Sequence, residues 1–226
     1  MGGQACVFYG AAEFSRDIDF AILANGTNFA RLKNALAELD AEVIAVPPFS
    51  LKYLRKGHAV HFRCRHPEAA GLRIDLMTKM RGVDSFPKLW ARRTTMALPD
   101  GTGCDLLSLP DLVQAKKTQR DKDWPMLRRL VEAHFFDHAR TQRSAHVKFW
   151  LRELRTPELL IEAARKAPAA ARRLTTRRPL LHQALAGDAR ALQVALRREE
   201  ELERASDRGY WKPLKVELES LRHAKV

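Results

Sequence analysis

The sequence predicts an α/β (α+β) protein, with a small mixed-sheet head followed by a helical C-terminal region. Two observations predict it. Short runs of alternating apolar and polar residues, which are typical of strands, lie in the first half of the 226 residues. Apolar residues spaced three and four apart, which are typical of amphipathic helices, fill the second half. We therefore expect an α/β head over residues 1–108 and a helical basic region over 109–226, of which 109–135 complete the candidate site of the head.

Strand-like runs and one helix make up the predicted head. In residues 17–23, apolar and acidic side chains alternate, so they face opposite sides of a strand. A break at Asn25-Gly26 precedes apolar spacing that predicts a helix through Leu39. In the run His58–Arg65, alternation places His61 on the face opposite Cys64 and His66, and this separation of potential ligands argues against a zinc site there. Further strand-like runs are 41–46 and 72–77, and a hairpin is expected where 94–98 and 104–107 flank Pro99–Gly103.

The helical region begins with a recognisable start signal. Ser108 is followed three residues later by Asp111, with Pro110 between them, and this combination is typical of a helix N-terminus. We expect a helix over Asp111–Lys122 and a second one from Asp123. Further helices are expected at 144–155, 157–167, 188–205 and 213–223.

Charge is distributed unevenly along the chain. Residues 1–110 hold 14 Lys and Arg against 11 Asp and Glu, and residues 111–226 hold 26 against 16, within a net charge of +13. A basic half suits a polyanionic partner such as nucleic acid or the phosphates of a nucleotide, and an ordinary solvated surface is the alternative. No run of 18 apolar residues and no N-terminal signal pattern is seen, so we expect no membrane partner. The three cysteines form no CxxC pair, and a cytoplasmic location is expected.

The chemistry-bearing pattern is Asp17-Ile18-Asp19. Residues i and i+2 of a strand point the same way, so the two carboxylates project together and repel each other unless a cation lies between them. Magnesium prefers such oxygen ligands and completes its octahedron with substrate phosphates. Asp75 lies in a second strand-like run, and a neighbouring strand would bring it to the same place. Three carboxylates can hold two metal ions about 4 Å apart, an arrangement for in-line phosphoryl transfer.

A glycine pair precedes these acids. Gly2 and Gly3 provide a turn at which backbone N–H groups can approach a phosphate without a Cβ in the way. The helix expected over Gln4–Tyr9 would direct its positive end at that anion.

The motifs Gly2-Gly3-Gln4-Ala5, Tyr9-Gly10 and Phe14-Ser15-Arg16-Asp17-Ile18-Asp19-Phe20 resemble the nucleotidyltransferase superfamily of DNA polymerase beta type. Within it, the sequence is most similar to the AbiEii/AbiGii-like toxin nucleotidyltransferases. The resemblance implies that Asp17, Asp19 and Asp75 are catalytic metal ligands for two Mg²⁺ ions. It also implies that Gly2, Gly3 and Ser15 contribute to binding a nucleoside triphosphate.

A second block of the resemblance covers residues 109–123. Lys116, Arg120, Lys122 and Asp123 match the order of basic and acidic residues in these relatives, which implies nucleotide-binding roles for Lys116, Arg120 and Asp123. On the expected helix, Lys116 and Arg120 are i and i+4 and share a face that would neutralise phosphates. The alternatives are a solvated basic face and, for Asp123, the N-cap of the next helix.

The resemblance implies transfer of a nucleoside monophosphate from an NTP to an acceptor hydroxyl, with Asp75 also helping to deprotonate that hydroxyl. RNA such as a tRNA end is the expected acceptor, a protein hydroxyl or a small molecule is the alternative, and a cognate antitoxin is a possible partner. The rival class is a non-catalytic module of the same fold that binds RNA or a partner protein. The clustered acids argue against the rival, because a polyanion binder gains nothing from negative charge.

Overall fold

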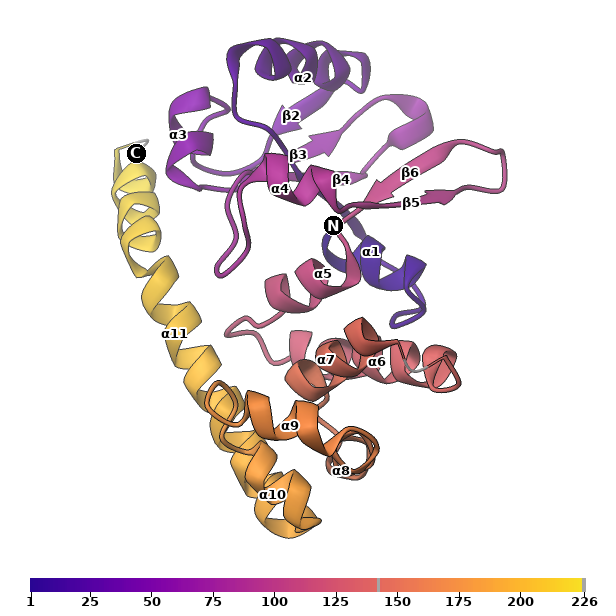
Figure 1. Cartoon of the computed structure of the whole chain (residues 1–226). Helices are drawn as coiled ribbons and strands as arrows, with labels where there is room; N and C mark the ends of the chain where they lie inside the picture. Colours follow the sequence, from indigo (N-terminus) through magenta and orange to yellow (C-terminus); the bar gives the residue numbers. More distant parts are fainter. Residues whose placement is uncertain (142, 225–226) are drawn as a thin grey trace. The chain divides into compact units, whose positions relative to one another are not determined.

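The structure is a computed structural model that describes residues 1–141 and 143–224. The chain falls into two compact units, shown as ribbons in Figure 1. The head unit is Met1–Ala115 together with the C-terminal segment from Gly209, and the helical unit is Lys116–Arg208. Residues 109–115 and the segment from Gly209 thus group with the head, whereas the sequence assigned them to the helical region.

The head unit is built on a small mixed sheet, as expected. Its four strands lie in the order β1-β4-β3-β2, with β1 parallel to β4 and the other pairs antiparallel. A separate antiparallel pair, β5-β6, confirms the predicted hairpin. The strands are β1 Asp17–Ala21, β2 Ala41–Val43, β3 Val60–Cys64, β4 Arg73–Met77, β5 Thr94–Ala97 and β6 Gly103–Leu106.

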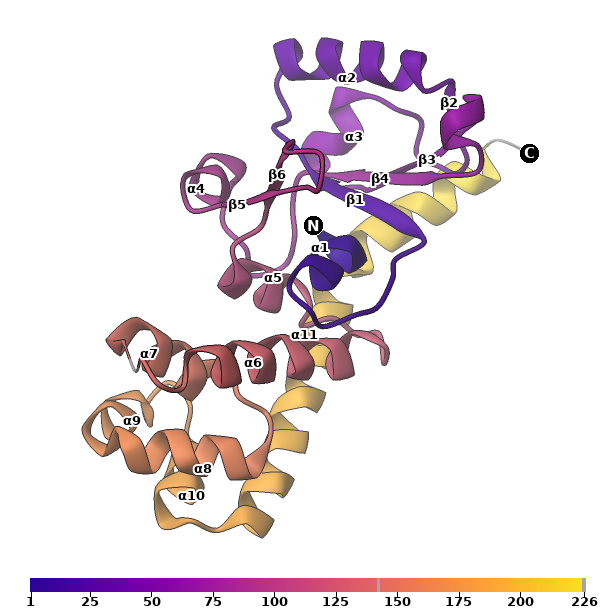
Figure 2. The same ribbon diagram turned by 90° about the vertical axis from the view of Figure 1, so that its right-hand side faces the viewer.

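Helices cover both faces of this sheet. Helices α2 and α3 lie on one face and α1 lies on the other (Figure 2). The predicted break before α2 is its cap, since the Asn25 side chain accepts a hydrogen bond from the Asn28 backbone N–H at 2.8 Å. The head helices are α1 Gly2–Phe8, α2 Gly26–Glu38, α3 Leu51–Lys56, the 3₁₀ helix Pro67–Ala69, α4 Phe86–Ala91 and α5 Leu109–Ala115.

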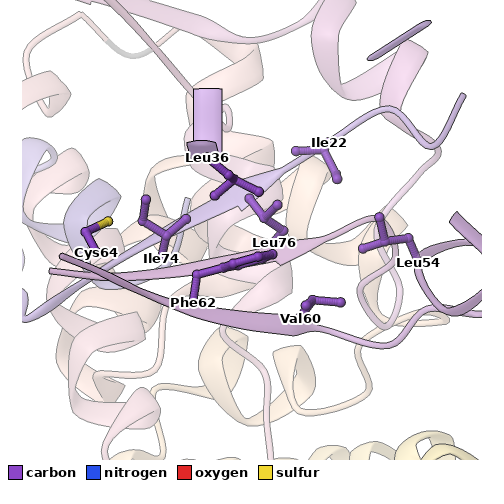
Figure 3. Packing of buried hydrophobic residues seen from close by; sticks show 8 residues of the cluster. All are labelled: Ile22, Leu36, Leu54, Val60, Phe62, Cys64, Ile74 and Leu76. Carbon is purple, nitrogen blue, oxygen red and sulfur yellow. The ribbon is translucent and has the colours of Figure 1, made fainter. Parts of the chain in front are cut away.

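The apolar face of the sheet forms the core of the head. Phe62, Ile74 and Leu76 project from neighbouring strands and pack against Leu36 of α2 and Leu54 of α3, so burial of this face fixes the strand register (Figure 3). Because side chains alternate along a strand, the residues between these positions must face the other way. The acidic residues of β1 and β4 are among them.

The helical unit consists of α-helices joined by short connections. The expected helix beginning at Asp123 is present, and those predicted at 144–155 and 157–167 are present within two residues at each end. The helices are α6 Asp123–His138, α7 Ser144–Glu153, α8 Pro157–Lys166, α9 Pro168–Leu174, α10 Leu181–Ala186 and α11 Ala189–His223, the last of which continues into the head unit.

Two helix predictions are wrong. The helix expected over Asp111–Lys122 ends at Ala115. Beyond it, Thr118 Oγ1 accepts a hydrogen bond from the Arg120 backbone N–H and donates one to Asp123. These local hydrogen bonds compete with the backbone hydrogen bonds of a helix. The two helices expected at 188–205 and 213–223 are one continuous helix with Pro213 inside it. Proline removes one backbone donor but does not end this helix, which continues for ten further residues to His223.

No helix among the described residues is both long enough and apolar enough to cross a membrane.

Candidate metal centre on the head sheet

The three acids predicted as metal ligands come from two adjacent strands. In the parallel pairing of β1 with β4, Asp19 is the direct partner of Asp75, and Asp17 is the partner of Arg73. Side chains at partnered positions share a face of the sheet. The structure therefore places Asp17, Asp19 and Asp75 on the face opposite the apolar core.

Two basic side chains, Arg73 and His61, share this face with the acids. Arg73 donates to Asp75 through both Nε, 2.9 Å from Oδ1, and Nη2, 3.0 Å from Oδ2. His61 on β3 is the register partner of Asp75, and its Nδ1 lies 2.8 Å from Oδ1. Because a carboxylate only accepts, this contact requires the proton on His61 Nδ1, and Arg73 Nη2, 3.2 Å from the same nitrogen, then does not donate to it.

The surroundings of Asp75 keep it ionised. Burial of this carboxyl opposes ionisation, but hydrogen bonds and positive charge from His61 and Arg73 outweigh burial, so the pKa of Asp75 lies below its usual value. The pKa of Arg73 is raised, chiefly by its hydrogen bond to Asp75 and also by the negative charge of Asp17 and Asp19. Arg73 is thus a counter-ion to all three acids.

The acids retain the capacity to bind an ion, although Asp75 is partly engaged. Its Oδ1 accepts from both Arg73 and His61, while Oδ2 accepts from Arg73 and keeps a second lone pair. Among the described residues, the three acids do not form a group whose oxygens all lie mutually close enough for one ion; the single such group is formed by histidines. Mg²⁺ shared by all three would require side-chain rotation or bridging water, which magnesium commonly retains.

The glycine pair lies directly against these acids. A Cβ on Gly2 would be 1.7 Å from Asp19 Oδ2, and Gly2 has a φ of +66°, so glycine is required there for both space and conformation. A Cβ on Gly3 would be 2.5 Å from Ser15 Oγ. The Gly3 N–H points at Asp19 Oδ2 over 3.4 Å, and Ser15 Oγ donates to Asp17 Oδ1 at 3.1 Å. Gly2, Gly3 and Ser15 therefore position the carboxylates in this structure.

The predicted nucleotide-binding residues of the second block form a different arrangement. Lys116 and Arg120 do not share a helical face, because the chain leaves the helix at Ala115. Both cations instead contact Asp123, Lys116 Nζ at 3.1 Å and Arg120 Nε at 2.7 Å. Asp123 is fully buried and also accepts from Thr118 Oγ1 at 2.5 Å. Burial acts against its ionisation, yet the two cations dominate and the pKa of Asp123 is lowered.

These three residues belong to the helical unit, whereas the acids belong to the head unit. Asp123 already pairs with both cations that were predicted to meet phosphate. Nor is Asp123 the N-cap of α6, since it is the first residue of that helix and Lys122 occupies the cap.

Sequence reasoning missed Arg73 and the contact made by His61. Strand alternation gave a usable signal for Arg73, because it lies two residues before Asp75 and so shares its face. The pairing of His61 with Asp75 depends on the strand order, which alternation alone does not determine.

An apolar groove lies beside β1. Its wall contains Phe20, which follows Asp19 in sequence, and the stacked pair Phe86 and Trp90, whose ring centroids are 5.7 Å apart. The Arg93 guanidinium lies 4.0 Å from the Trp90 ring centroid. Aromatic faces beside a cation are suited to planar, electron-rich ligands. The lining residues are Met1, Phe20, Ala21, Phe86, Leu89, Trp90, Arg93, Asp105, Leu106 and Leu107.

A scan against protein-family models finds no match to this chain, and a search of curated proteins finds none either. Inference about function therefore starts from the side chains described above.

Proposed function

We propose that the chain is a metal-dependent nucleotidyltransferase that transfers a nucleoside monophosphate from an NTP to an acceptor hydroxyl. The observation that carries the proposal is the register of β1 and β4, which sets Asp19 beside Asp75 on the face that also bears Asp17. Three carboxylates on one face of a sheet repel one another, Arg73 offsets only part of their charge, and carboxylate oxygen is the donor that Mg²⁺ prefers.

The residues of the site have separate tasks in this proposal. Asp17 and Asp19 bind Mg²⁺, which when bound would neutralise charge on the triphosphate and on the leaving pyrophosphate. Ser15 holds Asp17 in place, and Gly2 leaves room for the Asp19 carboxylate. Asp75 contributes one further oxygen. Its lowered pKa suits binding an ion better than removing a proton from the acceptor hydroxyl, which requires a stronger base.

The groove beside β1 supports a nucleotide as the ligand. The wall of the groove includes Phe20 and the aromatic pair Phe86 and Trp90, which offer faces for stacking on a base. The net charge of +13 supports an RNA acceptor such as a tRNA end, because a polyanion is attracted to such a surface. A cognate antitoxin protein is proposed as a partner on the resemblance alone.

The test combines binding and transfer. Each NTP with Mg²⁺ is expected to raise the melting temperature of the full chain, and one labelled NTP is expected to label total RNA. Asp17→Asn and Asp75→Asn should abolish both effects, while Glu38→Gln, an exposed acid at the end of α2, should retain them. Absence of a shift with every NTP in the wild-type chain would refute the proposal.

A specific observation favours the rival module that binds without chemistry. Arg73 already gives Asp75 a cationic partner through two hydrogen bonds, so a protein charge could replace the metal at this position. A chain that binds RNA with unchanged affinity after chelation of all divalent ions, and that transfers no label, would establish the rival.

A further inference from the structure

Three histidines gather in the helical unit, away from the acids in sequence and in a different compact unit. His134 and His138 lie four residues apart on α6, and His146 lies on α7. Each offers a ring nitrogen, and these three nitrogens all lie within 4.8 Å of one another, the one group of this kind among residues 1–141 and 143–224. We propose that His134, His138 and His146 form a binding site for a transition-metal ion, with Zn²⁺ as the first candidate.

The fold brings the rings together by two local features. Residues four apart on a helix lie on the same face, so His134 and His138 stack, with ring centroids 4.3 Å apart and an interplanar angle of 18°. His146 meets both rings nearly edge-on, at 4.9 Å from His134 and 4.6 Å from His138. The site therefore joins two helices that are separated by a short connection in the chain.

Hydrogen bonding leaves suitable lone pairs at two of the three rings. His138 Nδ1 lies 3.1 Å from the His134 carbonyl oxygen. A carbonyl only accepts, so Nδ1 carries the proton and Nε2 keeps a lone pair, which is the usual condition of a metal-binding histidine. His146 Nδ1 is shielded from solvent and has no hydrogen-bond partner within the described part of the chain. A buried nitrogen without a partner is uncommon, and coordination to an ion would satisfy it.

His134 is the ring that must change its partner. Trp150 Nε1 donates to His134 Nδ1 at 2.9 Å, which uses that lone pair and leaves the proton on Nε2. Metal binding through either nitrogen of His134 therefore competes with the hydrogen bond from Trp150. Tetrahedral zinc with bonds of about 2.0–2.1 Å separates its nitrogens by roughly 3.4 Å, so the rings also need a modest approach.

The chemistry of the donor set selects the class of ion. Three neutral imidazoles suit Zn²⁺, Cu²⁺ and Ni²⁺, and they do not suit Mg²⁺ or Ca²⁺, which require oxygen. Burial and the neighbouring histidines lower the pKa of His134 to about 4, so its ring is neutral at physiological pH. Three ligands leave a fourth tetrahedral position for water or an added ligand.

The test uses Zn²⁺ itself with the full chain, in excess Mg²⁺ so that carboxylate sites are occupied. Calorimetry should detect one zinc ion per chain. In His138→Ala and His146→Ala, zinc affinity should fall by more than ~100-fold, because losing a ligand costs more than the ~10–100-fold that follows loss of a residue hydrogen-bonded to a ligand. His182→Ala, which removes an exposed histidine of the same unit, should bind zinc normally. Equal affinity in the wild type and the two cluster variants would overturn the proposal.

Two further measurements do not depend on whether the alanine variants fold. Zinc should shift the imidazole ¹⁵N resonances of three histidines in the wild-type chain, and unchanged resonances would overturn the proposal. Trp150→Phe should bind zinc several-fold more tightly, because His134 no longer shares its lone pair with the indole. Weaker binding in a folded Trp150→Phe chain would overturn the assigned role of His134. The site is independent of the acids, so Asp17→Asn should leave zinc binding unchanged.

Discussion

The acidic face of the head sheet and the buried ion cluster of the helical unit both combine carboxylates with basic side chains. They differ in the balance of charge and in burial. In the helical unit, the Asp123 carboxylate is fully buried and is enclosed by Lys116, Arg120 and Thr118. In the head unit, Asp17, Asp19 and Asp75 share a face with Arg73 and His61, both of which contact Asp75. The sequence motifs suggested binding at both places. A buried carboxylate that is already paired with cations of the same chain has a structural role, whereas several like charges on one face favour a bound ion.

The largest expected effect comes from making the same isosteric change in both regions. Asp123→Asn leaves the buried Lys116 beside a neutral amide, and breaking a buried ion pair in this way costs about 3 kcal/mol. Asp19→Asn removes one of several repelling carboxylates and should change the free energy of unfolding little, while it abolishes the response to NTP and Mg²⁺. Urea denaturation of the wild type and both variants measures these differences in the free energy of unfolding.

A pH titration supplies the control for Asp123. Its pKa is lower in the folded protein than in the unfolded chain, so the carboxylate stabilises the fold above about pH 4 and this contribution is lost as pH falls through the folded value. Asp123→Asn should lose that part of the acid dependence. If Asp19→Asn were the more destabilising of the two variants, the acidic face would be structural and the comparison would fail.

The next effect concerns the space that glycine provides beside the acids. Gly2→Ala places a Cβ against Asp19 Oδ2 and adopts a φ of +66°, so we expect about 2 kcal/mol of destabilisation and loss of the NTP response. Gly10→Ala is the matched control, since Gly10 has a φ of +72° and no atom within 4 Å of an added Cβ. It should cost about 1 kcal/mol and keep the response. Equal effects in thermal denaturation and NTP binding would show that Gly2 matters only for its backbone.

Local patterns predicted much of the head and less of the site. Alternation placed Asp17 and Asp19 on one face, and the register of β1 with β4 confirms that they share it. That Asp75 would be the direct partner of Asp19 depends on the order β1-β4-β3-β2, which is set by packing between distant segments.

The helical unit shows where local patterns fail. The residues after Ala115 have helical periodicity, but the contacts of Thr118 and Asp123 lie outside any pattern and end the helix. In the C-terminal segment that groups with the head, a separate helix was expected at 213–223, yet α11 continues through Pro213. The spacing of His134 and His138 was visible in the sequence, whereas the third histidine joins them only through the packing of α7 on α6.

The smallest expected effect tests whether Arg73 competes with the metal or belongs to the site. Arg73→Gln removes a partly exposed partner of Asp75, so the free energy of unfolding should change by less than about 1 kcal/mol. The pKa of Asp75 should rise toward its usual value, but His61 still donates to it, and the carboxylate stays ionised at pH 7. If Arg73 occupies the place of a cation, Mg²⁺ should now bind more tightly, as measured by the magnesium concentration that gives half of the thermal shift.

Arg63→Gln is the matched control for that measurement, because Arg63 is the register partner of Arg73 on β3 and its loss changes the net charge equally. It should leave magnesium affinity nearly unchanged, since the attraction of an exposed charge is screened by solvent. Weaker binding of NTP with Mg²⁺ in Arg73→Gln alone would assign Arg73 to the substrate, as a partner for phosphate. Either result distinguishes the acidic face from the cluster around Asp123. In that cluster, no bound ligand is expected to replace a cation that a substitution removes.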